Sequence, residues 1–405
     1  MKHQKTLIRS GISSHKGILF GIACLIFLIS LSLSAALAVW QNSAGYVRSE
    51  MDRLGFGDIT VWVYGQENIA PLAEQIGGLE EISQVGTQKL IFSEYEIGDH
   101  TSDSEGQLIV YTPENYAYRF FAEDCISYAP APQEIPDGVV YVSPSMISMF
   151  SVGIGDSIIF PIARSGRDIT LTVGGFYEDP FMGSSMIGMK GLLISEQTWQ
   201  QIAAMVQQAG HNALARTGYM LHITAAAESG LTAAQLNILL NQQTLIQRVT
   251  EFTHSFDAIF GFMMTLQNVF IGLLLAFLAV LLLAAMVVLS HAIRNTIEMD
   301  FIDLGICKTM GYTTGDLRCV QSWQYALASL VGMVPGTILS AVISGLLSRL
   351  MVTTIGVLVP SGLPVLLCAG ALGCILVLLL AFVWFKTGQI AQVSPIEVIR
   401  GAHRR

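Results

Sequence analysis

Apolar residues gather in four long uncharged segments that are spaced very unevenly along this chain. The first segment, Ile18–Trp40, is 23 residues long and lies close to the N-terminus. More than 200 residues of mixed polarity follow, and the other three segments crowd into the last third at Leu266–Ile293, Val320–Leu347 and Leu363–Phe385. A helix needs about 20 apolar residues to cross the hydrocarbon core of a bilayer. The pattern therefore predicts four transmembrane helices in a one-plus-three arrangement, with a large domain between the first and the second.

This long segment, 41–265, mixes the spacing of strands with that of helices. Asp58–Tyr64 alternates around β-branched and aromatic residues, which is typical of a strand. Ile69–Ile76 has helical spacing and is followed by two glycines, which often end a helix. The segment therefore predicts a mixed α+β domain that stands outside the membrane.

Two borders inside this domain follow from the changing pattern. Short stretches of strand character separated by glycines predict a β-rich insertion at about 123–216, so the surrounding α+β part consists of 57–122 and 217–245. A helical pattern begins near Thr232 and runs, with or without a break, into the second apolar segment. We therefore expect 246–265 to form a helical stalk.

Basic residues mark one side of the membrane. Four basic residues and no acidic one precede the first apolar segment, whereas 41–256 holds 24 acidic and 9 basic residues, a net charge of −15. Short segments rich in Lys and Arg remain in the cytoplasm. We therefore expect 1–17, the connection 294–318 and the tail 386–405 to be cytoplasmic and 41–265 to be extracytoplasmic, in a multi-pass protein of the cell membrane. The acidic domain also argues against nucleic acid as a partner.

A cleaved signal peptide is the alternative interpretation of the first apolar segment. Basic residues precede it, and Ala36-Leu37-Ala38 resembles a small-residue cleavage site. However, its 23 residues exceed the usual apolar core of a signal peptide, about 7–15 residues. We therefore interpret Ile18–Trp40 as a retained membrane anchor.

Motifs for catalysis, metals and cofactors are missing from the sequence. Gly183–Gly191 has the glycines of a phosphate-binding loop, but Met189 stands where that motif needs lysine. The eight histidines lack the spacing of metal ligands, and no G-x-S-x-G nucleophile motif is present. The apolar segments contain no charged residue, which argues against an ion-coupled carrier. We therefore expect a protein that is not an enzyme and binds no cofactor or metal.

The connection 294–318 contains an amphipathic stretch. One face carries apolar residues at roughly helical spacing, namely Ile297, Phe301, Leu304 and Ile306. The other face carries the charged residues Glu298, Asp300, Asp303 and Lys308. Gly311 is suited to end the helix. Such a helix can lie in the membrane interface or dock a partner, and the pattern alone leaves both open.

This loop resembles that of the FtsX-like/MacB-like permease family of ABC transporters, also called type VII. The family pattern is approximately E-I-G-I-L-K-A-x-G, and residues 303–311 have D-L-G-I-C-K-T-M-G. Cys307 and Thr309 depart from the usual Leu and Ala, and Asp303 replaces Glu. The C-terminal S-P-I-E-V-I-R also resembles the closing S-P-x-E-x-L-R of the family, through Ser394, Pro395, Glu397 and Arg400. Together with the one-plus-three layout, the resemblance covers essentially the whole chain.

The resemblance implies a permease subunit that has no ATPase activity of its own. Its partners would be a cytoplasmic ABC ATPase subunit, which uses ATP and Mg²⁺, and a second permease subunit in a homodimer or a paralogous heterodimer. Thr296–Gly311 would be the coupling helix that docks the ATPase through its apolar face. Its residues are Glu298, Phe301, Asp303, Leu304, Gly305, Ile306, Lys308 and Gly311.

The resemblance also implies what the ATPase drives. Nucleotide-dependent closure would be passed along stalk helices to the extracytoplasmic domain (mechanotransmission), an α+β porter-like part with a β-rich insertion. The expected result is export or extrusion of a peptide, antibiotic, lipid-linked or other amphiphilic substrate, with or without an extracytoplasmic adaptor. The alternative is an FtsX-type regulatory protein that controls an extracellular hydrolase or sensor without moving a substrate. The sequence leaves these two functions open.

Two glycines in the third apolar segment predict a close helix contact. Gly332 and Gly336 are four residues apart and share one face of the helix, while Pro335 between them should kink it. Packing within one chain and packing at a dimer seam both agree with this pattern.

Overall fold

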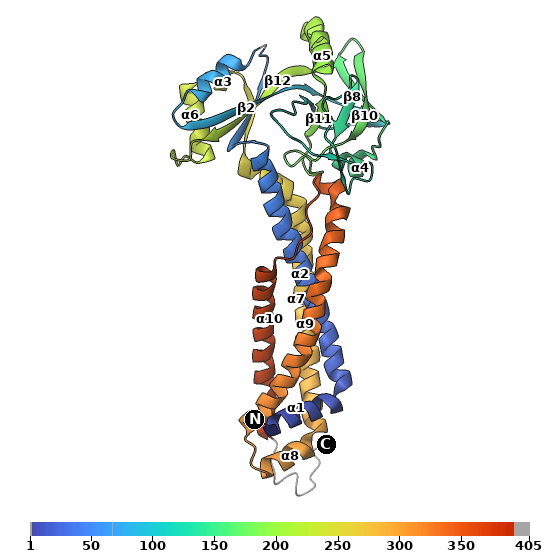
Figure 1. Ribbon diagram of the computed structural model, residues 1–405, viewed down its shortest axis with the longest axis vertical. Coiled ribbons are helices and arrows are strands. Elements are labelled where there is room, and N and C mark those ends of the chain that lie inside the picture. The colour runs from blue at the N-terminus through green and yellow to red at the C-terminus, as the bar shows by residue number, and fades with distance from the viewer. Residues whose placement is uncertain (1, 67, 393–405) are drawn as a thin grey trace. The chain divides into compact units, whose positions relative to one another are not determined.

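The computed structural model describes residues 2–66 and 68–392, and it divides the chain into two compact units (Figure 1). The helical unit comprises Met1–Asn42, Val269–Leu346 and Ser361–Arg405. The sheet unit comprises Ser43–Asn268 and Leu347–Pro360. The C-terminal motif lies outside the described residues, namely Ser394, Pro395, Glu397 and Arg400.

Long helices dominate the C-terminal third of the chain and the region near its N-terminus. They and the short helices between them are α1 (Lys2–Ser14), α2 (Lys16–Arg53), α7 (Phe256–Met299), α8 (Phe301–Thr309), α9 (Thr314–Ile355), α10 (Val365–Lys386) and the 3₁₀ turn η3 (Thr387–Gln392). Among the described residues, four helices are long and apolar enough to cross a membrane: α2, α7, α9, and α10 with its following turn. This confirms the predicted one-plus-three arrangement.

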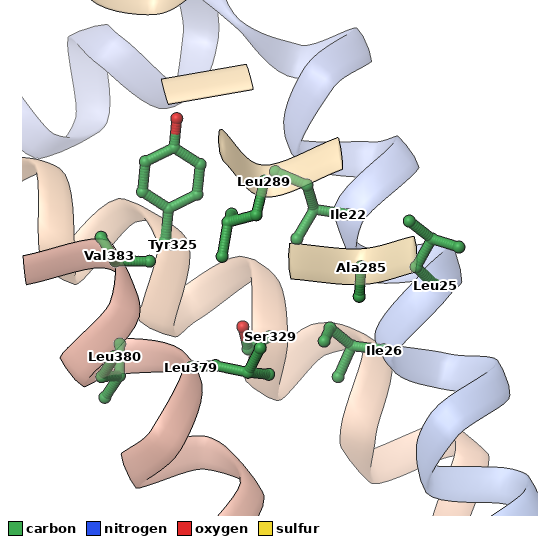
Figure 2. Close-up of a pocket in the computed structure, with 10 residues that line it drawn as sticks. All are labelled: Ile22, Leu25, Ile26, Ala285, Leu289, Tyr325, Ser329, Leu379, Leu380 and Val383. Atoms are coloured by element: carbon green, nitrogen blue, oxygen red, sulfur yellow. The ribbon is translucent and has the colours of Figure 1, made fainter. Parts of the chain in front are cut away.

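The helical unit packs around α2. Inside the structure, 61% of the most apolar part of α2 is buried, against 17–39% for the other three long helices, so α2 is the central helix. Figure 2 shows ten side chains of α2, α7, α9 and α10 around a small pocket. Its volume is about 10 Å³, room for one water molecule at most, so this pocket is not a ligand site.

The first part of the sheet unit is a β-α-β-β-α-β motif. Its elements are β1 (Ile59–Tyr64), α3 (Ala70–Gly77), β2 (Ile82–Ser93), β12 (Arg216–Ala225), α6 (Ala233–Gln243) and β13 (Thr250–Ser255), with a 3₁₀ turn η2 (Ile246–Arg248) before β13. The strands lie in the order β13-β1-β12-β2, and all neighbours are antiparallel, which is the ferredoxin-like arrangement. Ile59, Val61 and Val63 alternate along β1 and pack in one core with residues of α3 and α6, because successive strand side chains point to opposite faces.

An insertion between β2 and β12 extends the same sheet. Its elements are β3 (Glu96–Ile97), β4 (His100–Thr101), β5 (Gly106–Val110), β6 (Phe120–Phe121), β7 (Tyr128–Ala129), β8 (Val139–Val142), α4 (Ser145–Phe150), β9 (Ser157–Ala163), β10 (Arg167–Phe176), β11 (Lys190–Ile194), α5 (Glu196–Ala209) and the 3₁₀ turn η1 (Gly210–Asn212). Beyond β2 the order continues β5-β11-β8-β10-β9-β3-β4, so the described strands form one sheet of eleven, with β6 and β7 as a separate pair. The domain therefore mixes helices and strands, as predicted for an α+β domain. One sheet runs through both of its expected parts, with no break at the border expected near residue 123.

The helical stretch expected from near Thr232 into the second span is broken, and the first part of the expected helical stalk, 246–265, is not an α-helix. α6 ends at Gln243, and Thr250–Ser255 forms β13, which pairs antiparallel with β1. Helix α7 begins only at Phe256, whose N–H donates to the Asp58 carbonyl at 2.8 Å. The expected stalk, 246–265, is thus an edge strand followed by a helix, because β1 offers unpaired backbone groups that this segment satisfies.

The end of α9 belongs to the sheet unit. From Leu347 onward the chain is part of that unit, up to Pro360. Val352 packs in the core around β8 and β10, and Ile355 and Val357 pack in the core around Trp62. The sheet unit therefore contains residues of three long helices, α2, α7 and α9.

Candidate functional site

The stretch predicted as one amphipathic helix is divided by a turn. Its beginning is the last turn of α7, and α8 covers Phe301–Thr309. Asp300 lies between them with φ −93° and ψ 14°, outside the helical region. Its Oδ2 is 2.8 Å from Nε2 of His15, a buried residue at the junction of α1 and α2. The turn is therefore held in place by a contact to the N-terminal helices.

The apolar face predicted to dock a partner is largely internal. Ile297 is buried, and Phe301 and Leu304 pack against the core of the helical unit. Only Ile306 of the predicted four is exposed, at 48%. Helical spacing identifies which residues share a face, but it does not say whether that face meets the protein's own core or a partner.

A different row of apolar side chains faces outward. Ile302, Ile306 and Met310 are 53%, 48% and 64% exposed. They are spaced by four residues, so Ile302 and Ile306 lie one above the other on the same side of α8, and Met310 follows directly after its end. We call these three residues the exposed stripe.

Most of the charged and glycine residues predicted for this site hold the loop in shape. Glu298 pairs with Arg294 one turn away on α7, at 2.9 Å. The Lys308 ammonium donates to the Ile390 carbonyl of η3 at 2.8 Å, and burial lowers the pKa of this lysine. Gly305 is buried, whereas Asp303 is exposed. Gly311 has φ +96°, a conformation that favours glycine, so it ends the helical segment as predicted.

A second group of residues, missed by the sequence analysis, joins the end of α9 to the loop after β10. Glu178 is 2% exposed. Its carboxylate accepts the Leu358 N–H at 2.8 Å, the Tyr128 hydroxyl at 2.7 Å and the Tyr46 hydroxyl at 2.9 Å. Arg119 lies 3.6 Å from the same carboxylate. Burial raises the pKa of Glu178, and the hydrogen bonds oppose this shift.

The neighbouring Asp179 completes this joint. Its carboxylate accepts the N–H groups of Phe181 and Met182, both at 2.9 Å, and its own N–H donates to the Gly356 carbonyl at 3.3 Å. The Ser185 N–H donates to the carbonyl of Thr354 at 2.8 Å. Gly356 has φ +75°, and a Cβ there would overlap the Gly183 carbonyl.

We call Glu178–Ser185 and Thr354–Leu358 together the clamp. The carboxylates of its loop, Glu178 and Asp179, both have several hydrogen-bond donors among the described residues. The clamp is therefore a completed joint inside the sheet unit, which fixes the end of α9 to the loop after β10.

The two glycines of α9 face α2 of the same chain. A Cβ at Gly332 would overlap the Ala23 carbonyl, and one at Gly336 would overlap the Ser30 hydroxyl and the Phe27 carbonyl. Of the two alternatives left open by the sequence, the structure shows packing within the chain. Close approach of the two helices explains why side chains are missing at these positions.

Residues 275–395 match the family described as FtsX-like permease C-terminal. This confirms the resemblance that the loop pattern suggested, and the match covers the end of α7, all of α8 and α9, and α10. No curated protein sequence matches the chain.

Two solved structures are similar to about half of the chain. The periplasmic region of MacB from Actinobacillus actinomycetemcomitans is 13% identical, with 51% of this chain and 92% of that chain covered and a TM-score of 0.26. The extracellular domain of the noncanonic ABC-type transporter YknZ from Gram-positive bacteria is 11% identical, with 48% and 98% covered and a TM-score of 0.24. Similarity at this level carries no information about substrate or mechanism.

Proposed function

Because residues 275–395 match the family described as FtsX-like permease C-terminal, we propose that this chain is the permease subunit of an ABC transporter driven by a separate cytoplasmic ATPase. The single observation that carries the proposal is the exposed stripe, Ile302, Ile306 and Met310. Three large apolar side chains on a short loop between two membrane helices suit the groove of a protein partner.

The contacts that attach α8 to the rest of the helical unit suit a helix that transmits a movement of the partner. His15 holds the turn before α8, and the Lys308 ammonium is bonded to the carbonyl of Ile390 beyond α10. Leu304 anchors the inner face of α8 in the helical core. A partner that moves α8 would therefore move the ends of α7 and α9 to which it is joined.

Two helices lead from this loop into the sheet unit. α7 is continuous over 44 residues, about 66 Å at 1.5 Å per residue, and it reaches the edge strand β13. α9 has 42 residues and its last turns belong to the clamp. We propose that closure of the ATPase is passed along these helices to the sheet unit, which performs work on an exported peptide, antibiotic, lipid-linked or other amphiphilic substrate.

The proposed orientation places 1–17, 294–318 and 386–405 in the cytoplasm and the sheet unit outside it. The basic residues of these short segments and the net charge of −15 over 41–256 support it. A β-α-β unit of a nucleotide-binding fold takes about 30 residues or more, so the connection 294–318 has no room for such a fold. In this proposal ATP and Mg²⁺ are bound by the partner ATPase, and a second permease subunit completes the assembly.

The docking proposal is tested by co-purification from the native host. Ile306→Asp places a charge in a contact that should be desolvated, which costs about 2–5 kcal/mol at protein interfaces. We expect the Walker-type ATPase recovered with the tagged chain to fall at least about tenfold, because 1.4 kcal/mol corresponds to a factor of ten. Ile238→Asp is the matched control, since Ile238 is a similarly exposed isoleucine, at 55%, on α6 of the sheet unit. Full recovery of the ATPase with Ile306→Asp would contradict the docking site.

A further inference from the structure

The sheet unit contains a cavity of about 300 Å³ between the loop after β10 and the first turns of α7. Residues from four parts of the chain line it, among them Trp62, Met182, Met186, Met189, His254 and Phe262. No Asp, Glu, Lys or Arg is among the residues that line this cavity. Its wall is therefore apolar, with the Ser104 hydroxyl and the His254 ring as its polar side-chain groups.

One wall of the cavity is aromatic and held in place. Trp62 is 1% exposed, and its indole N–H donates to the Gln107 side-chain oxygen at 2.9 Å. The His254 ring stands edge-on to Trp62, with ring centroids 5.7 Å apart, and edge-on to Phe262 at 6.1 Å. Burial lowers the pKa of His254, which favours the neutral form of this ring. Such a wall favours flat apolar ligands that offer further ring contacts.

The loop Met182–Met189 contributes three methionines to the lining of the cavity. Met182 is buried, and the Gln107 amide donates to the sulfur of Met189 at 3.4 Å. Met186 and, on the α7 side, Phe262 are 54% and 50% exposed. Thioethers are polarisable and make favourable contacts with aromatic rings.

We propose that this cavity binds a small, uncharged aromatic molecule of about two rings. An apolar cavity of about 150 Å³ accommodates one benzene molecule, so about 300 Å³ suits two rings. A charged ligand would lose its hydration here without gaining a partner of opposite charge. This binding goes beyond the proposed function, because it requires neither the ATPase nor a second subunit. Ile259 and Phe262 belong to α7, so an occupant contacts the helix that continues into the second span.

Photolabelling with benzophenone tests this site, because benzophenone is uncharged, has two rings and inserts into nearby C–H bonds on illumination. The full chain in lipid nanodiscs is illuminated over a range of benzophenone concentrations, and adducts on Met182 and Met189 are quantified by peptide mass spectrometry. We expect labelling that saturates. The matched probe is 4-benzoylbenzoate, which adds one carboxylate to the same two rings and should label these residues at least about tenfold less.

Variants at two exposed methionines separate the site from general labelling. Met186→Glu places a carboxylate at the cavity wall and should lower labelling of Met182 and Met189 about tenfold. Met149→Glu makes the same change at a methionine of α4 that does not line the cavity, and should leave labelling unchanged. Labelling that rises without saturation, equals that by 4-benzoylbenzoate, or persists in Met186→Glu would overturn the proposal.

Discussion

The outer side of α8 and the clamp are opposite kinds of surface within one chain. On and directly after α8, the three large apolar side chains of the exposed stripe are 48–64% exposed. In the clamp, the Glu178 carboxylate is 2% exposed and accepts hydrogen bonds from a backbone N–H and two tyrosine hydroxyls. The exposed stripe leaves apolar surface open to solvent, whereas the carboxylates of the clamp have their hydrogen-bond partners within the chain.

This difference separates a docking surface from a joint. Exposed apolar side chains on a well-anchored helix are hydrated at a cost in free energy, and covering them with another surface removes that cost. A buried carboxylate with several donors already has its hydrogen bonds, and these bonds break if the donor groups move. Changes in the exposed stripe should therefore alter assembly, and changes at the clamp should alter stability.

The largest effect is expected from Glu178→Ala in the clamp. This change removes the acceptor for the Leu358 N–H and two tyrosine hydroxyls and the carboxylate paired with Arg119. Breaking a buried pair of this kind lowers the free energy of unfolding by about 3–5 kcal/mol. Thermal unfolding of the purified chain should show this loss. Glu105→Ala is the control, because the pair of Glu105 with Arg216 is 36% and 44% exposed and should contribute about 1 kcal/mol or less. Equal effects of the two variants would remove the distinction between the clamp and an ordinary surface pair.

The two faces of α8 should respond differently to the same change. Leu304→Asp puts a charge against the core of the helical unit and should lower the free energy of unfolding by about 2–3 kcal/mol. Ile306→Asp, two residues away, should change it by less than about 0.5 kcal/mol, because the side chain is exposed. Unfolding of both variants is measured without any ATPase. If Ile306→Asp is the less stable of the two, the inner and outer faces have been assigned wrongly.

The seam between α2 and α9 is a second completed joint, and Gly336→Ala should weaken it. The added Cβ would overlap the backbone of α2 at Phe27, and such overpacking costs about 1–3 kcal/mol. Gly272→Ala on α7 is the control, since a Cβ at that position meets no atom within 4 Å. Thermal unfolding in detergent should separate the two variants, and equal stability would show that the helices are not in close contact.

The smallest effect concerns pH and Lys190, which is buried at the start of β11, five residues after the clamp loop. Burial lowers the pKa of this lysine from its ordinary value of 10.5 to about 8, although Asp179 opposes the shift. A lowered pKa in the folded protein means that stability falls as the pH drops from about 10.5 to about 8 and stays at the lower level below that. Between pH 8 and 9.5, wild-type stability should rise by up to about 1.4 kcal/mol per pH unit. Lys190→Met should remove this rise, and identical pH profiles would show that Lys190 does not titrate in this range.

The membrane layout could be predicted from the sequence because long uncharged apolar runs have one dominant solution in a bilayer. Which face of α8 is exposed could not be predicted in the same way. Leu304 and Ile306 both belong to an amphipathic pattern, and only the packing of Leu304 on the helical core shows which side is free. The predicted segment contains a helix, but a turn at Asp300 divides it, and three of the four residues on its predicted docking face are internal.

The clamp and β13 depended on contacts between distant parts of the chain. Glu178-Asp179-Pro180 has the composition of a surface loop, and its partner, Leu358, is 180 positions away. Thr250–Ser255 is short, and it precedes a strongly apolar helix whose pattern conceals it. Alternating threonine, phenylalanine and histidine residues in this segment were the available signal. The segment becomes a strand because it pairs with the edge of β1.

The central claim, that α8 couples this chain to a separate ATPase, is tested most directly by ATP hydrolysis in a reconstituted system. The purified chain alone should show only background hydrolysis. Hydrolysis by the partner ATPase should increase when wild-type chain in nanodiscs is added and should not increase with Ile302→Asp, which alters the exposed stripe at a second position. Strong hydrolysis by the chain alone, or full stimulation by Ile302→Asp, would contradict the account.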